Sequence, residues 1–142
     1  MAYEDFAALV EAHAQQIAQE MAAHVIATAP NADRLDAKQI EATFVQGISV
    51  LATYLRDGDP EPFKQFFVQI GGNSFQAGGD VDSFRSTGQI FTQKLKELVE
   101  HEYAGPANER VRESYKRRLD SLNTLTNVTI INTHIAKRNE SE

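Results

Sequence analysis

Apolar residues recur every three or four positions along most of this chain, which is the spacing of amphipathic helices. The longest such stretch runs from Pro106 to Arg138. A helix of about 30 residues spans roughly 45 Å, more than a domain of this size needs for its own core. We therefore predict a homodimer interface on the shared apolar face, formed by Leu119, Leu122, Leu125, Val128, Ile131 and Ile135.

The same spacing predicts four helices before Pro106. They run from Tyr3 to Thr28, from Asp36 to Asp57, from Asp59 to about Asn73, and from Asp80 to Tyr103. No convincing strand pattern occurs in the sequence. The predicted fold is all-α, a bundle of about five helices. Residues 1–105 form its body and residues 106–142 form a long C-terminal dimerisation or output helix of the same domain.

Capping residues mark several of these boundaries. Asp36 with Gln39 has the form of a capping box, and Asp59 precedes Pro60 as an N-cap would. The glycine-rich run from Gly71 to Gly79 matches no phosphate-binding motif, so we interpret it as a loop between helices.

The helix that starts after Asp59 carries four large apolar residues within eight positions, too many for one narrow face. The segment is therefore either buried on two sides within the core or lines a pocket. Our hypothesis for the pocket is a cavity that accepts an apolar ligand such as a fatty acid, surrounded by Phe44, Phe66, Phe67 and Phe91.

Composition narrows the class of protein. The 142 residues are 42% hydrophobic and 24% charged, as in ordinary soluble domains. There is no cysteine, which excludes disulfides and thiolate chemistry. No apolar run reaches the roughly 18 residues of a membrane span, and the acidic N-terminus lacks the pattern of a secretion signal. These features predict a cytoplasmic protein that does not bind membranes.

The net charge is −6, with the acidic residues concentrated before Pro106, which argues against nucleic-acid binding. The last helix begins with a basic cluster. We interpret this cluster as a solvated face paired with Glu109 and Glu113, and the alternative is a phosphate or lipid-headgroup site. Its residues are Arg110, Arg112, Lys116, Arg117 and Arg118.

Catalytic and metal-binding motifs are missing from the sequence. HExxH, GxSxG and ExxH do not occur, and Glu97 with His101 is interpreted as a helix-surface pair. His13 and His24 lie close to one helix face without a third ligand at a suitable spacing, so we interpret them as core or boundary residues. We therefore predict no catalytic, cofactor-binding or metal-binding residues and no enzymatic activity.

The segment from Leu51 to Leu98 combines an acidic turn, an aromatic-rich helix, a glycine-containing segment and a second apolar helix. In this pattern the chain resembles the non-haem globin sensor domains at the N-terminus of bacterial RsbR-type stressosome proteins and related sensor kinases. One difference is Gly71 to Ser74, where that family often has arginine or histidine. The residues that carry the likeness are Leu51, Leu55, Asp57, Asp59, Phe63 to Ile70, Phe75 to Gly78 and Val81 to Leu98.

The resemblance implies a globin-like fold, a homodimer and a signal-receiving role without catalysis. It also implies that the final helix relays a signal to a downstream output module of the STAS or kinase type. Haem globins take their proximal histidine from the segment ahead of the two long C-terminal helices. Here that segment is roughly residues 56–80, and it contains no histidine. We therefore expect no haem and no other cofactor.

Overall fold

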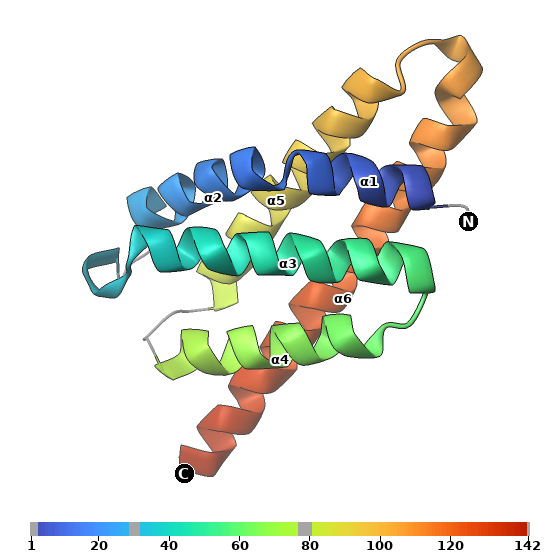
Figure 1. Cartoon of the computed structure of the whole chain (residues 1–142). Helices are drawn as coiled ribbons and strands as arrows, with labels where there is room; N and C mark the ends of the chain where they lie inside the picture. Colours follow the sequence, from blue (N-terminus) through green and yellow to red (C-terminus); the bar gives the residue numbers. More distant parts are fainter. Residues whose placement is uncertain (1–2, 29–31, 77–80, 142) are drawn as a thin grey trace.

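The computed structural model describes residues 3–28, 32–76 and 81–141, and these ranges contain six α-helices, two short 3-10 helices and no strand (Figure 1). The predicted all-α fold with a long final helix is confirmed. In chain order the elements are α1 (Glu4–Ala12), α2 (Ala14–Thr28), η1 (Ala32–Arg34), α3 (Ala37–Asp57), α4 (Glu61–Gln76), α5 (Val81–Glu102), η2 (Pro106–Asn108) and α6 (Glu109–Ser141).

The predicted Asp36 cap begins α3, and a glycine ends it. The Asp36 carboxylate accepts hydrogen bonds from the backbone N–H groups of Lys38 (2.9 Å) and Gln39 (3.4 Å). At the other end Gly58 has φ +75°, the left-handed conformation that glycine adopts most easily, and its N–H donates to the Tyr54 carbonyl at 2.8 Å. Both boundaries follow from local chemistry that the sequence displays.

The first predicted helix is in fact two helices. It breaks at His13, which has φ −106° and ψ 8°. The His13 imidazole Nδ1 lies 3.1 Å from the Leu9 carbonyl oxygen, within hydrogen-bonding distance. Neither proline nor glycine lies at this break. The three- to four-residue spacing of apolar residues therefore continues across it without interruption. Figure 1 shows α1 and α2 following one another along the same side of α3.

The prediction of a loop from Gly71 to Gly79 is wrong over its first half, because α4 continues to Gln76. Residues 77–80, which include the predicted helix start at Asp80, lie outside the described residues. Gly71 is buried where α4 meets α6, and a Cβ built on it would lie 2.9 Å from the Thr133 Cβ. The glycine therefore serves close packing between helices here, which offsets its low helix propensity.

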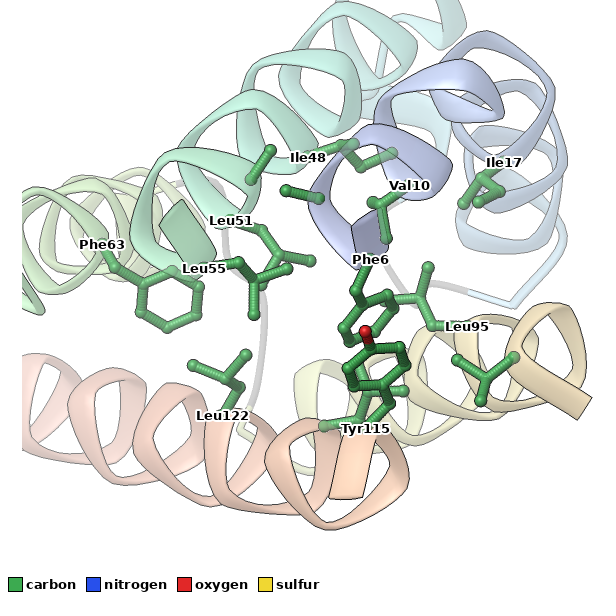
Figure 2. Close-up of a cluster of buried hydrophobic side chains, with 14 of the residues drawn as sticks. Phe6, Val10, Ile17, Ile48, Leu51, Leu55, Phe63, Leu95, Tyr115 and Leu122 are labelled. Carbon is green, nitrogen blue, oxygen red and sulfur yellow. The ribbon is translucent and has the colours of Figure 1, made fainter. Parts of the chain in front are cut away.

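The hydrophobic core joins α1 and α2 to α3, to Phe63 of α4, to α5 and to the first half of α6 (Figure 2). Phe6 is fully buried and stacks on Tyr115, with ring centroids 4.7 Å apart and planes 17° apart. Tyr103 meets the same Tyr115 ring edge-on at 5.2 Å. Each fully buried large apolar side chain contributes about 1.5–3 kcal/mol through removal from water. The first and last helices of the chain are thus held together by aromatic packing.

The apolar face of α6 divides along its length. Leu119 and Leu122 are 3% and 5% exposed and belong to the core of their own chain, while Leu125 and Ile131 are half-buried. Val128 and Ile135 are 49% and 42% exposed. Of the six residues predicted at a dimer interface, these last two have the most surface left for a partner.

The basic cluster at the start of α6 ties that helix to α5 and the connecting turn. Lys116 Nζ lies 2.5 Å from the Glu100 carboxylate, and its hydrogen bond to that carboxylate lowers the pKa of Glu100. The Arg112 guanidinium donates to the carbonyls of Tyr103 and Gly105, both at 2.6 Å. Lys116 also lies 3.7 Å from Glu113, as predicted, but Glu100 on α5 is its closer partner. Much of this cluster therefore has a structural role.

Candidate apolar binding cavity

A cavity of about 580 Å³ lies between α3, α4, α5 and α6, with the end of α2 beside it. This volume is within the range of small-molecule sites, roughly 300–1,000 Å³. All four phenylalanines of the predicted apolar pocket line it: Phe44, Phe66, Phe67 and Phe91.

The four phenylalanines come from three helices and form two ring pairs. Phe44 of α3 and Phe91 of α5 have ring centroids 5.9 Å apart. Phe66 and Phe67 of α4 meet at 5.1 Å with nearly perpendicular planes, and Phe67 also contacts Phe84 of α5 at 6.4 Å. Edge-on and tilted pairs at these distances are favourable. The structure thus brings together aromatic residues that are far apart in the sequence.

Two further phenylalanines line the cavity that the sequence hypothesis did not include. Phe63 is 4% exposed and contacts Phe67, and Phe84 lies one turn before Gly88 on the cavity side of α5. The spacing of Phe84, Gly88 and Phe91 at four and three positions was the available signal, since it places all three on one helix face.

The two sides of the cavity differ in polarity. The side formed by α3 and α4 is mainly aromatic and aliphatic, with Gln39, Thr43 and Asn73 as its polar lining residues. The side formed by α5 and α6 also carries a band of small polar residues, in which Thr92 and Thr126 are almost fully buried. Apart from Phe84, Phe91 and the leucines, this side presents Ser83, Thr87, Gly88, Thr92, Asn123 and Thr126.

The cavity has a buried end and an exposed end. At the buried end lie Leu51, Leu95 and Leu119, each under 5% exposed. At the other end lie Arg34 and Asp36, both exposed, and Asp36 is occupied in capping α3. Lining residues extend from Asp36, the N-cap of α3, to Leu51 within that helix, which is roughly 22 Å at 1.5 Å per residue. The space is therefore elongated and suits a ligand that enters with its apolar end first.

The histidines lie away from this cavity. His13 and His101 line a smaller hollow of about 310 Å³ with Glu20 and Lys94, whose charged groups pair at 3.0 Å. That pairing lowers the pKa of Glu20. Within the described residues no three histidine, cysteine, aspartate or glutamate side chains are arranged to hold a metal ion.

Comparison with protein-family models, with curated protein sequences and with solved structures finds no match to this chain. Over the described ranges, none of the helices combines the length and the apolar character needed to cross a membrane. The cavity is consequently interpreted from its own residues.

Proposed function

We propose that this protein binds a small apolar molecule in the cavity between α3, α4, α5 and α6. The observation that carries the proposal is an elongated space of about 580 Å³ with a mainly aromatic and aliphatic lining. Protein interiors are packed to a density of about 0.75, and voids larger than a water molecule are few. A space of this size inside a helical bundle is therefore more consistent with a binding site than with a packing defect.

The volume sets the size of the ligand. A water molecule in the liquid occupies about 30 Å³, so the cavity offers the space of roughly 19 waters. A ligand of about 15–20 non-hydrogen atoms fits, a range that includes fatty acids. At about 0.3 kcal/mol per atom, such a ligand gains up to about 6 kcal/mol, which corresponds to a Kd of tens of micromolar.

Native mass spectrometry of the purified protein tests for a bound species, and titration with a fluorescent fatty acid measures affinity. Thr87→Trp places a bulky side chain in the cavity and is expected to weaken binding at least tenfold. Gln89→Trp is the matched control, because Gln89 lies two positions away on α5, is exposed and does not line the cavity. Absence of binding by the wild type, or equal loss in both variants, would contradict the proposal.

A second proposal is that the cavity is the input of a bacterial signalling dimer and that α6 carries the response. α6 lines the cavity through Leu122 and Thr126, so a ligand there would contact it directly. It also carries two of the three large apolar side chains that are exposed in the described part of the chain: Val128 and Ile135, with Val68 on α4 as the third. Val128 and Ile135 lie seven positions apart and therefore on the same face.

The resemblance to the sensor domains of stressosome proteins and kinases supplies the dimer and the downstream module of this proposal. A second copy would pack on the exposed apolar face of α6, and a cytoplasmic STAS or kinase module would receive the signal. No haem or other cofactor is part of this proposal.

The dimer is tested by light scattering at micromolar concentration. Val128→Glu with Ile135→Glu is expected to give a monomer, because burying unpaired charges is costly. Ser114→Glu with Ser121→Glu adds the same charge at exposed polar positions of α6 and should leave the dimer intact. Leu122 is unsuitable, since it is buried in its own chain's core. A monomeric wild type would refute the proposal.

A further inference from the structure

Arg34 is the one cationic side chain among the described residues that line the cavity between α3, α4, α5 and α6. It is the last residue of η1, which packs against α2, and it lies at the exposed end of the cavity. Within the part of the chain that the structure describes, its guanidinium forms no ion pair and no hydrogen bond. Its N–H donors are therefore available to a bound molecule.

Asp36 is the other charged residue at this end, and its carboxylate is already engaged. It accepts hydrogen bonds from the backbone N–H groups of Lys38 and Gln39 at the start of α3. The positive end of the helix dipole, equivalent to about half an elementary charge, offsets much of its negative charge. Arg34 is therefore the group at the open end that is best able to hold a charged part of a ligand.

The buried end of the cavity favours the opposite chemistry. It is formed by Leu51, Leu95 and Leu119, and none of the described residues there carries a charge. A charged group at that end would lose its hydration without gaining a partner. An apolar tail instead gains about fourfold in affinity for each CH₂ group that it buries. A molecule with one apolar end and one anionic end would match both ends of this elongated space.

Resting on the proposed function, we infer that the ligand is an amphipathic carboxylate, with its ionised head group bound by the Arg34 guanidinium at the open end and its tail directed toward Leu95. The planar guanidinium presents paired N–H donors that match the two oxygens of a carboxylate. A cationic head group would be repelled by Arg34, and a neutral head group would gain nothing from its charge.

Two probes with the same unbranched tail and different head groups isolate the effect of the charge. Dodecanoate and dodecanol are titrated at about pH 8, where an exposed carboxyl group is ionised. Displacement of the neutral dye Nile red reports the binding of each. Arg34→Gln should weaken dodecanoate binding about fivefold, the upper range for an exposed ion pair, and change dodecanol binding by less than about twofold. Because both probes share the tail, a general loss of cavity binding cancels in their affinity ratio.

Lys38→Gln is the matched control. Lys38 is exposed close to Arg34 in the sequence and does not line the cavity, so its replacement removes the same charge without altering the site. The affinity ratio of dodecanoate to dodecanol should stay within about twofold of the wild-type ratio. Arg34→Lys keeps the charge but loses the paired donors, so it should retain part of the ratio. Salt of about 0.5 M should reduce the ratio in the wild type and leave it unchanged in Arg34→Gln, because salt screens exposed charges.

The outcomes separate this inference from the proposed function. If Arg34→Gln weakens neither probe, or weakens both equally, the carboxylate site is overturned and an apolar cavity site remains. An equal change of the ratio in Lys38→Gln would mean that net charge acts at a distance, and would also overturn the contact with Arg34. Failure of both probes to bind the wild type would overturn the proposed binding function itself. Thermal unfolding of each variant confirms that it is folded.

Discussion

The close approach of α4 to α6 at Gly71 provides a sharp test of the packing, because its neighbour Gly72 supplies an internal control. A Cβ on Gly71 would lie 2.9 Å from Thr133 Cβ and 3.0 Å from Thr133 Cγ2. A Cβ on Gly72 would meet nothing closer than the Lys137 Cε, at 3.6 Å, which is ordinary van der Waals contact. Both glycines lie inside α4.

The two alanine substitutions share one favourable effect and differ in the other. Replacing glycine by alanine inside a helix gains about 1 kcal/mol. At Gly72 this gain should appear nearly in full. At Gly71 it is opposed by overpacking, which typically costs about 1–3 kcal/mol. The contact is with the Cβ of Thr133, so rotation of the threonine side chain cannot relieve it, and one helix must shift. We therefore expect Gly71→Ala to be about 1–3 kcal/mol less stable than Gly72→Ala.

Urea unfolding followed by circular dichroism measures this difference directly. A change in midpoint at constant slope reports a change in stability rather than in the surface exposed on unfolding. If Gly71→Ala proves as stable as Gly72→Ala, α4 and α6 are further apart than described, and the position of the α6 wall of the cavity is wrong.

Four other predictions concern the core, a helix cap and the pH dependence of stability. Phe6→Ala should cost about 3–5 kcal/mol in urea unfolding, because it leaves a hole beside Tyr115 that the surrounding helices fill only in part; a cost below 1 kcal/mol would refute the stacking. Asp36→Ala should cost about 1 kcal/mol through loss of the α3 cap, while Asp36→Asn should retain most of it. The Arg56 guanidinium lowers the pKa of Glu11 below 4.5, so stability present above that value should be lost as pH falls through the lowered pKa. In thermal melts Glu11→Gln should make this acid loss smaller, and an unchanged acid profile would contradict the pairing. Burial raises the pKa of Tyr115 above 10, so stability should fall as pH rises above about 10, and an unchanged alkaline melting temperature would count against that burial.

Helix positions were predictable where local chemistry sets them. The Asp36 cap and the Gly58 end of α3 are encoded within a few residues of each boundary, and the structure has both. The break at His13 could not be predicted, because it coincides with no proline or glycine. The extension of α4 through Gly71 was missed for a different reason. Gly71 is required by the side chain of Thr133 on α6. Local helix propensity carries no information about such contacts between distant segments.

The aromatic lining of the cavity was partly foreseeable. An excess of phenylalanine on the helix after Asp59 indicated a segment buried on two sides or beside a pocket, and periodicity placed Phe91 on the inner face of its helix. The polar features were not foreseeable. Asn123 and Asn127 look in the sequence like dilution of an apolar stripe, and only the position of Gly88 gives their side chains a shared direction. Likewise, periodicity grouped Leu122 with Val128, although burial separates them.

The stacking of Phe6 on Tyr115 has a consequence for how the chain is made. The two rings stand near opposite ends of the sequence, so the core around Phe6 cannot close until the first turns of α6 have left the ribosome. Until then α1 exposes an aromatic ring and its apolar neighbours, the kind of surface on which partly folded chains aggregate and which chaperones cover. A fragment that stops at Gly105 would remain in that state permanently. The core around Phe6 therefore forms only after the first turns of α6 have been synthesised.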